Sequence, residues 1–172
     1  HLKLRLKDEK ISMNIFINSG GMLTNLIHFL SLFSLLKNDF SLKFENKKNI
    51  KFFRSKNTSY HEMTGEVLFK SCDESQLSVQ SKILKKHVFM IVIKSKNNNL
   101  KINLNKDLKI KMTNLISSKK NSINFPLVSN VTSKNIKNFN KSLFLSLKLI
   151  EKNSLLILDF LEKSSKHKIF VR

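Results

Sequence analysis

The chain has 172 residues, and its 32 Lys and Arg residues against 12 Asp and Glu residues give a formal net charge of +20. This charge indicates a polyanionic partner. A hydrophobic content of 41% excludes the class of chains that stay disordered because they are highly charged and poor in apolar residues. The single cysteine, Cys72, excludes an intrachain disulfide framework and a zinc site built on several thiolates.

The composition also indicates the kind of genome that encodes the chain. Lysine supplies 29 of the basic residues, alanine is absent and glycine occurs only 3 times. Lysine has A/T-rich codons, whereas alanine and glycine need G/C. We infer an A+T-rich genome, such as an organellar one, and part of the lysine excess therefore reflects mutational bias.

The first predicted element is an apolar helix over residues 22–36, which follows Gly20 and Gly21 and ends before Lys37. At about 1.5 Å per residue it spans roughly 22 Å, short of the roughly 30 Å hydrocarbon core of a bilayer. Asn25 and His28 also lie inside it. These features favour a buried helix over a membrane segment.

Residues 40–56 alternate apolar and polar side chains on both sides of a polar NKKN stretch, which predicts a hairpin. Cations and rings are interleaved here, a pattern that suits RNA because cations neutralise phosphates and rings stack on unpaired bases. The alternative is a half-buried ribbon whose Phe side chains face a core and whose Lys side chains are merely solvated. The residues concerned are Lys43, Lys47, Lys48, Lys51, Arg54 and Lys56 with Phe44, Phe52 and Phe53.

An amphipathic helix is predicted over residues 60–70, beside the only acidic concentration of the chain. Its members are Glu62, Glu66, Asp73 and Glu74, and we expect them to meet another protein or the chain's own lysines. His61 and Cys72 lie nearby, but nothing in the sequence fixes a base beside the thiol or supplies an oxyanion loop. We therefore predict no Cys/His active site.

The remaining elements predict a βαβ unit followed by helices. An apolar strand at 88–93 precedes Leu100, Leu104 and Leu108 at helical spacing and a second short apolar segment at 110–116. Residues 117–124 are a predicted loop, 133–152 a long helix and 155–161 a second helix. No glycine-rich nucleotide loop is present, and the cations after the two strands are Lys94, Lys96, Lys119 and Lys120.

These elements predict an α/β fold, a parallel flavodoxin-like or Rossmann-like three-layer sheet that is incomplete at its N-terminal side and carries an inserted hairpin. We expect a single domain over residues 1–163, with the insert at about 38–75 and a basic tail at 164–172. Because neither a catalytic constellation nor a cofactor loop is written in the sequence, we also expect a protein that is not an enzyme and that binds no cofactor or metal.

Two segments resemble the small-subunit ribosomal protein two (S-two) family of bacteria and organelles. The segment at residues 14–25 ends in GGMLTN, which is identical to the family motif that leads into a long helix, and INFPLVSN at 123–130 resembles the family's IDYPIPGN. The separation of the segments agrees within a couple of residues. The motif residues are Gly20, Gly21, Met22, Leu23, Thr24, Asn25, Pro126 and Asn130.

The resemblance has departures. The Arg-Trp pair before the glycines is missing, Ser129 replaces a family glycine, and the helical hairpin that the family inserts is not clearly written. The N-terminal strands of the family's sheet are also absent, so we expect a separate chain, or neighbouring proteins and RNA, to supply them.

The resemblance implies a structural constituent of the mitochondrial small ribosomal subunit, located in the matrix, that binds rRNA and neighbouring ribosomal proteins and has no membrane span. Two alternatives stay open: an accessory subunit of an organellar respiratory membrane complex, and a free RNA-binding maturation factor. The expected RNA contacts are the six cations of residues 40–56, Lys94, Lys96, Lys119 and Lys120 after the strands, and Lys134, Lys137 and Lys141 on the long helix.

Overall fold

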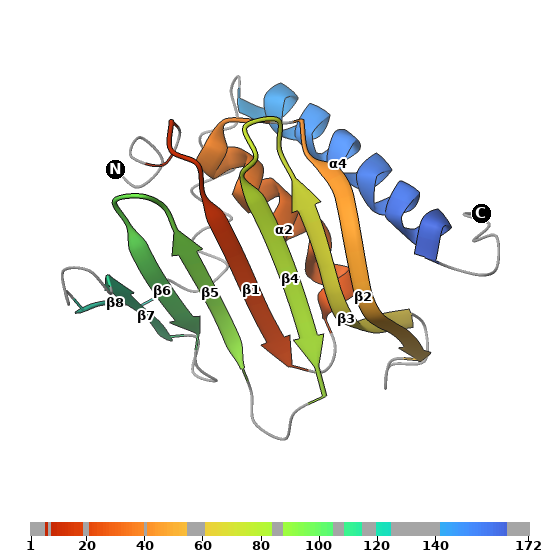
Figure 1. The fold of residues 1–172 in the computed structure, drawn as a ribbon, viewed down its shortest axis with the longest axis horizontal. Helices are drawn as coiled ribbons and strands as arrows, with labels where there is room; N and C mark the ends of the chain where they lie inside the picture. Colours follow the sequence, from red (N-terminus) through yellow and green to blue (C-terminus); the bar gives the residue numbers. More distant parts are fainter. Residues whose placement is uncertain are drawn as a thin grey trace.

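The computed structural model describes residues 6, 8–18, 21–39, 41–54, 61–83, 88–104, 109–114, 120–124 and 142–164. The strands and helices in these ranges alternate only near the N-terminus, and a run of strands precedes the last helix (Figure 1). In chain order they are β1 (Ser12–Asn18), α2 (Met22–Lys37), β2 (Lys43–Arg54), β3 (His61–Lys70), β4 (Gln76–Lys82), β5 (Phe89–Lys94), β6 (Asn99–Leu104), β7 (Lys109–Asn114), β8 (Lys120–Asn124) and α4 (Ser142–Ser164).

The described strands form one eight-stranded sheet in the order β2-β3-β4-β1-β5-β6-β7-β8. Only β1 and β4 pair in parallel, and every other pairing is antiparallel. The sheet is not closed, so β2 and β8 are its edge strands. Both edges of β1 are paired within the chain, which leaves no vacancy beside it for a strand from another molecule.

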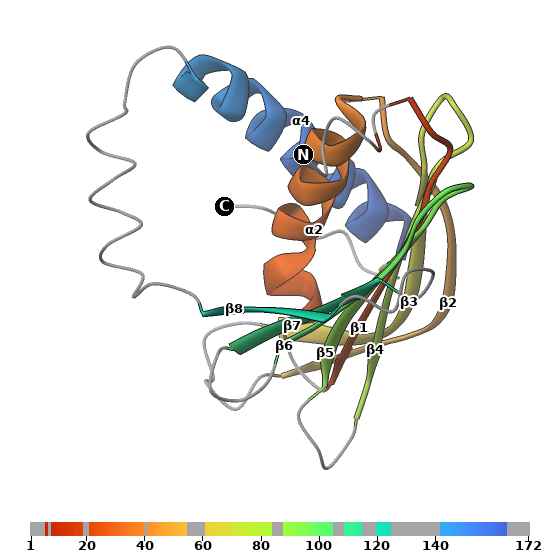
Figure 2. The ribbon, with the colours of Figure 1, turned by 90° about the vertical axis from the view of Figure 1, so that its left-hand side faces the viewer.

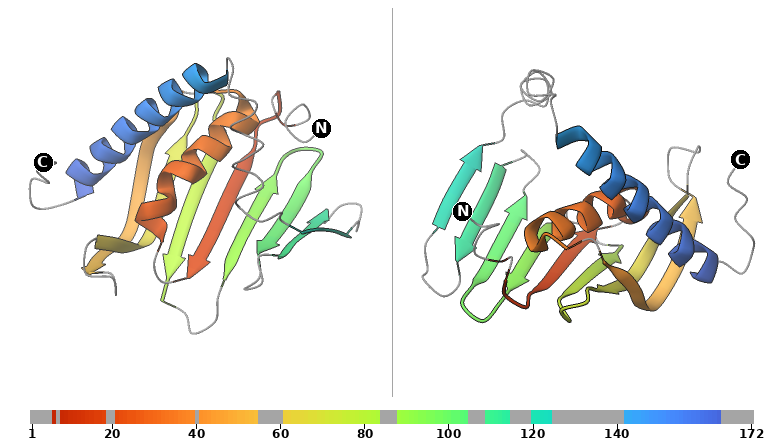
Figure 3. Two further views of the ribbon diagram at one scale, coloured as in Figure 1. Left: turned by 180° about the vertical axis from the view of Figure 1, so that it is seen from behind. Right: turned by 90° about the horizontal axis from the view of Figure 1, so that it is seen from above.

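Both helices pack on the same face of this sheet. Figures 2 and 3 show that the sheet is curved and that α2 and α4 lie on its concave side. The core lies between the two layers: alternate residues of β1, Met13, Ile15 and Ile17, are buried together with the apolar side chains of α2 such as Leu30 and Phe33. The period-two burial of β1 is the pattern of a strand with one covered face.

Helix α2 confirms the predicted apolar helix almost residue for residue. Gly21 precedes it with a φ of 87°, a left-handed conformation that glycine adopts without cost, and Asn38 follows it with a φ of 52°. The Asn38 N–H donates to the carbonyl oxygen of Ser34 and so satisfies one of the last carbonyls of the helix.

The expected break between two helices, at 133–152 and 155–161, is wrong, because residues 142–164 form one uninterrupted helix, α4. Asn153, the polar residue near the expected break, is buried and donates from Nδ2 to the Ser31 hydroxyl of α2 at 3.1 Å. Phe160 is fully buried beside Phe44 of β2, with 5.3 Å between ring centroids. A polar residue that finds a partner in the neighbouring helix therefore does not end this one.

The predicted βαβ unit is wrong, because β5, β6, β7 and β8 form an antiparallel meander. The Leu100 and Leu104 spacing of four residues fits a helix, but with Ile102 between them the apolar residues also alternate. In the sheet, Leu100 pairs with Ile93 and Ile102 with Ile91. A spacing of four residues fits the helical period and the strand period equally well. Here pairing with the neighbouring apolar strand, β5, selects the strand. The expected loop at 117–124 likewise ends in β8.

The expected hairpin at 40–56 and helix at 60–70 are wrong as well. β2 is one strand of twelve residues, and it pairs with β3 over the segment predicted to be helical. The polar NKKN stretch is absorbed within β2 as an irregularity: the register shifts between Lys48 and Lys51, and Asn49 has a φ of 54°. The polar NKKN stretch does interrupt the regular strand, but it forms a bulge within β2 and not a turn between two strands.

The α/β fold class and the unclosed sheet are confirmed. The strand directions and layers differ from the expected ones, since a single parallel pair replaces a parallel sheet and the described helices cover one face only. Continuous apolar strands suggested two covered faces, yet the apolar run of β5 alternates between buried Ile91 and Ile93 and half-buried Met90 and Val92.

Candidate nucleic-acid interface

The outer strand β2 carries the densest group of cations among the described residues. Its side chains at Lys43, Lys48, Lys51 and Arg54 are exposed, and Lys47 is half-buried. These five residues are the β2 cations. The described part of the chain forms ion pairs at Lys37–Asp73, Lys70–Glu74 and Lys163–Asp159, none of which involves a β2 cation. Their positive charge therefore faces solvent at one edge of the sheet.

Two of the β2 rings belong to different environments. Phe44 contacts Phe69 of β3 and Phe160 of α4, with 6.1 Å and 5.3 Å between ring centroids, so it packs against the core. Phe52, in contrast, remains 39% exposed. The half-buried ribbon alternative is correct for Phe44, while Phe52 is available for contact.

Lys47 ties β2 to the end of α4. Its Nζ donates to the carbonyl oxygen of Lys163 at 2.6 Å, at the last turn of the helix where carbonyls lack intrahelical partners. A cation at a helix C-terminus also interacts favourably with the helix dipole. Lys47 therefore supports the packing of α4 as well as adding to the charge of β2.

The irregularity of β2 lies directly against Gly65 of β3. Gly65 has a φ of 123°, and a Cβ atom on it would lie 2.7 Å from the carbonyl oxygens of Lys48 and Asn49. Only glycine permits this approach. Beside it lies a groove of about 430 Å³ between β2, β3 and the end of β4. Its lining residues are Lys48, Asn49, Lys51, Thr64, Gly65, Glu66, Gln80, Ser81, Lys82 and Ile83.

The acidic side chains at residues 62–74 interact with other groups of the same chain. Asp73 and Glu74 pair with Lys37 and Lys70, as one of the two expectations for this cluster had it. The buried Glu62 instead accepts a hydrogen bond from the N–H of Leu23 at 3.0 Å, at the start of α2. A carboxylate is stabilised there by the free backbone amides and by the helix dipole.

The remaining acid of the cluster, Glu66, lies in the sheet. Its Oε1 accepts bonds from the Ser78 hydroxyl at 2.9 Å and from the Gln80 amide at 3.1 Å.

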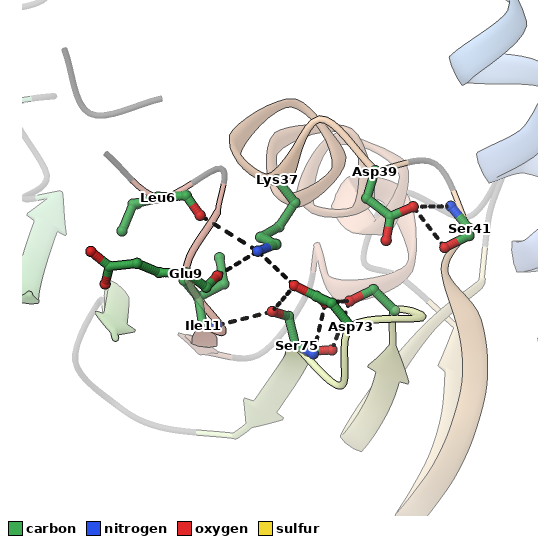
Figure 4. Close-up of polar contacts among 9 residues, drawn as sticks. Leu6, Glu9, Ile11, Lys37, Asp39, Ser41, Asp73 and Ser75 are labelled. Carbon is green, nitrogen blue, oxygen red and sulfur yellow. Dashed lines mark hydrogen bonds and ion pairs between the residues drawn. The ribbon is translucent and has the colours of Figure 1, made fainter. Parts of the chain in front are cut away.

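Lys37 is the centre of a separate, structural cluster at the end of α2 (Figure 4). Its side chain is 2% exposed, and Nζ lies 2.7 Å from Asp73 Oδ2 and donates to the backbone carbonyls of Leu6 and Glu9. Burial acts to raise the pKa of Asp73, but hydrogen bonds from Lys37, Ser71 and Ser75 hold that pKa well below its usual value. This cluster joins the N-terminal segment, α2 and the turn between β3 and β4.

The structure does not bring the other expected RNA contacts to β2. Lys94 ends β5 and Lys96 lies in the turn after it, both exposed, whereas β5 is four strands away from β2. Lys120 begins β8, at the opposite edge of the sheet. Five further expected contacts fall outside the described residues: Lys56, Lys119, Lys134, Lys137 and Lys141.

The S-two motif residues are only partly described. Residues 21–25 form the entry to α2, where the resemblance places a helix start, and the side-chain Nδ2 of Asn25 donates to the carbonyl of Gly21 at 2.7 Å. Gly20, Pro126 and Asn130 lie outside the described residues.

Sequence reasoning missed Lys82, Gly65 and Ser81 as members of one site. They are far apart in the chain from Lys48 and meet it only through the pairings of β3 with β2 and β4, in which Gly65 lies opposite Ser81. The available signal was Gly65 itself, a glycine inside the segment predicted to be helical, and its use required the strand assignment first.

Comparisons with known proteins give similar structures but no matching sequences. Neither a family model nor a curated protein matches the chain. Among solved structures, the dehydrogenase MviM from Clostridium difficile is similar with a TM-score of 0.54 at 14% identity, covering 95% of this chain and 58% of its own. A protein assigned as an oxidoreductase from Erwinia carotovora atroseptica has a TM-score of 0.60 at 10% identity, covering 98% and 60%.

A variant of the 3-ketoreductase KijD10 from Actinomadura kijaniata, solved with TDP-benzene and NADP, has a TM-score of 0.57 at 9% identity and covers 86% of this chain and 50% of its own. The chain thus spans between half and three fifths of the length of these proteins.

The expectation that the chain is not an enzyme is contradicted by these comparisons, because the similar structures are dehydrogenases, ketoreductases and other oxidoreductases. At 14% identity or less, the likeness establishes the fold alone and assigns no substrate or cofactor to this chain. Among the helices in the described ranges, none has the length and apolar character needed to cross a bilayer. The α/β sheet of this chain resembles the fold of these dehydrogenases.

Proposed function

We propose that the chain binds RNA through its outer strand β2. The observation that carries the proposal is the row of β2 cations on an edge strand, none of them in an ion pair among the described residues. Solvated cations in a row suit the regularly spaced phosphates of a nucleic acid, and the net charge of +20 favours association with any polyanion. The proposal concerns a binding surface and is compatible with catalysis elsewhere.

Lysine dominates this surface, so the contacts are point charges on phosphate rather than bidentate readout of bases. Arg54 is the one guanidinium on β2, and the exposed Phe52 lies within the same stretch. An exposed ring beside cations permits stacking of an unpaired base. We therefore expect binding of single-stranded segments with little sequence preference and with a strong dependence on salt.

The sharpest test compares two triple variants that remove equal charge. Lys43→Gln, Lys51→Gln and Arg54→Gln remove three of the five β2 charges at exposed positions, whereas Lys10→Gln, Lys111→Gln and Lys152→Gln neutralise exposed lysines elsewhere. Binding of a labelled oligouridylate is followed by fluorescence anisotropy from about 50 to 200 mM salt. The β2 variant should lower the slope of log K against log salt by about 2, since each lost contact removes roughly 0.7 for a single strand. Equal losses in both variants would overturn the proposal.

We further propose that the RNA is that of a mitochondrial small ribosomal subunit, as the GGMLTN resemblance implies. The motif residues at the start of α2 and the charge support this setting. Sedimentation of an organellar lysate with and without RNase tests it: co-migration with the small subunit at moderate salt supports the ribosomal setting. Recovery with membrane complexes regardless of RNase supports the respiratory alternative, and recovery in light RNase-sensitive fractions supports a free maturation factor.

A second candidate function is that of one part of an NAD(P)-dependent oxidoreductase, which the fold likeness favours. Nucleotide sites of doubly wound folds follow parallel strands and a glycine-rich loop, while the described sheet has one parallel pair. A cofactor would therefore be held largely by a partner or a further segment. A thermal shift with NADPH tests direct binding, because saturation at 100 times Kd stabilises a protein by about 2.7 kcal/mol. An unchanged melting temperature would argue against this candidate.

A further inference from the structure

The groove beside the β2 irregularity has a concentration of positive charge along its lining. Its wall on the β2 side carries Lys48 and Lys51, and the end of β4 contributes Lys82 from the other side. All three side chains are exposed, and none forms an ion pair among the described residues. A volume of about 430 Å³ lies within the roughly 300–1,000 Å³ range of small-ligand sites. The groove therefore has the size for one nucleotide unit and the charge for its phosphate.

One carboxylate also lines this groove and has to be counted against an anion. Glu66 lies opposite Lys48 in the strand register, and its Oε1 already accepts hydrogen bonds from Ser78 and Gln80. Three cations face this one acid, so the lining keeps a net positive charge. Glu66 and Lys48 also line a smaller hollow of about 50 Å³ along β2, together with Lys47.

Two lining residues at the end of β4 lack partners that a folded chain normally supplies. Ser81 is 1% exposed, and its Oγ has no hydrogen-bond partner among the described residues. Buried polar atoms are nearly always satisfied, by protein, water or ligand. Ile83, two residues further on, is 76% exposed and offers an apolar surface at the rim. The Ser81 hydroxyl is closed to solvent, so a ligand in the groove reaches the apolar surface of Ile83 and not the Ser81 Oγ.

We propose that this groove is a nucleotide subsite for single-stranded RNA, with the phosphate held by Lys48, Lys51 and Lys82 and the base lying against Ile83. The inference rests on the proposed RNA binding and locates one contact of it. The irregularity of β2 is then functional, because it brings the backbone of Lys48 and Asn49 against Gly65, and Lys48 and Lys51 line the same groove as Lys82. The ligand class is a phosphodiester with an unpaired base, and a duplex would not present that base to the groove.

The decisive experiment uses the full chain and a pair of apolar-to-serine variants that leave the charge unchanged. Ile83→Ser removes the apolar rim of the groove, and Leu155→Ser removes a second exposed apolar side chain, on α4, that does not line the groove. We expect Ile83→Ser to weaken binding of a labelled hexauridylate about threefold and Leu155→Ser to leave it unchanged. Neither should lower the melting temperature, since both side chains are exposed.

A pair of charge variants provides the second arm. Lys82→Gln should weaken hexauridylate binding about three- to tenfold, and Lys152→Gln on the exposed side of α4 should change it much less. Inorganic phosphate in excess should displace the oligonucleotide from wild type more effectively than from Lys82→Gln. If the wild type binds the oligonucleotide while Ile83→Ser and Lys82→Gln behave like their controls, the groove is not a subsite and RNA binding by β2 stands. If the wild type does not bind at all, both proposals fail.

Discussion

Lys37 and the β2 cations show two uses of the same residue type within one chain. Lys37 is 2% exposed and is held by Asp73 and by the carbonyls of Leu6 and Glu9. The exposed β2 lysines, such as Lys48 and Lys51, form no ion pair among the described residues. The net charge of +20 is therefore a sum over two populations, one that holds the fold together and one that is free to meet a partner.

The difference follows from the cost of burying a charge. A buried ammonium needs an opposite charge and further acceptors to replace its hydration. An exposed lysine keeps its water and requires nothing from the fold. Codon bias explains an excess of exposed lysines, but it does not explain a buried lysine paired with Asp73 and with backbone carbonyls. We expect substitutions to separate the two populations by their effects on folding and on binding.

The largest expected effect comes from Lys37→Met, which keeps the aliphatic stem and removes the ammonium. Asp73 and the two carbonyls then lose their shared donor, and removing one partner of a buried pair costs about 3–5 kcal/mol. Because the Asp73 side chain is 41% exposed, we expect about 3 kcal/mol. Urea unfolding followed by circular dichroism measures this loss.

Lys43→Gln is the matched control on β2. It should change the free energy of unfolding by less than about 0.5 kcal/mol, because its side chain is exposed and makes no ion pair among the described residues. If both variants lose similar stability, the distinction between structural and available lysines is wrong.

The second prediction tests the backbone beneath the β2 cations. Gly65→Ala would place a Cβ 2.7 Å from two backbone oxygens at a φ of 123°, and backbone atoms cannot move aside as a side chain can. We expect a loss of about 2–3 kcal/mol in the free energy of unfolding, measured by the same urea titration.

Gly21→Ala provides the comparison for this variant. There the added Cβ would meet the side-chain amide of Asn25 at 2.9 Å, which can rotate away, although the φ of 87° still costs energy. Its loss should be smaller, about 1 kcal/mol. A larger loss at Gly21 than at Gly65 would show that the contact between β3 and the β2 irregularity does not limit the fold.

Sequence reasoning identified what local pattern determines. Helix α2 is apolar on most sides and is bounded by a glycine and by polar residues, so its start and end are written in the chain itself. Strand β5 is a run of apolar residues between polar ones, and it was likewise predicted. In both cases no distant residue is needed to decide the period.

The errors lie where distant residues decide. The segment 61–70 contains Met63, Val67 and Phe69, whose spacings of four and two residues fit a helix and a strand respectively, and pairing with β2 and β4 selects the strand. The cations of β2 were identified correctly by composition, but Lys82 and Ser81 join the groove only through strand register. Charge can be counted from a sequence, whereas a site built across three strands cannot.

The smallest expected effect concerns Asp73 and Glu74, neighbours that each pair with a lysine: Asp73 with the buried Lys37 and Glu74 with the partly buried Lys70. The pKa of Asp73 is lowered in the folded state, so the stabilisation it provides is complete above about pH 5 and is lost as the pH falls through its usual value of 3.8 toward the lower folded-state pKa. Asp73→Asn should therefore reduce stability at pH 7 by about 1–2 kcal/mol. Its deficit relative to wild type should shrink between pH 5 and pH 3, as thermal unfolding over that range would show.

Glu74→Gln tests whether the acid sensitivity assigned to Asp73 comes from its buried lysine partner or is shared by any paired carboxylate. A hydrogen bond from Lys70 lowers the pKa of Glu74, but this carboxylate is 57% exposed and its partner is only partly buried. Solvent screens such a pair, and its removal should change stability and acid sensitivity less than Asp73→Asn does. Equal acid responses in the two variants would mean that Lys37 gains nothing from Asp73 beyond an ordinary surface pair, and that its other contacts, among them the Leu6 and Glu9 carbonyls, hold the buried cluster at the end of α2.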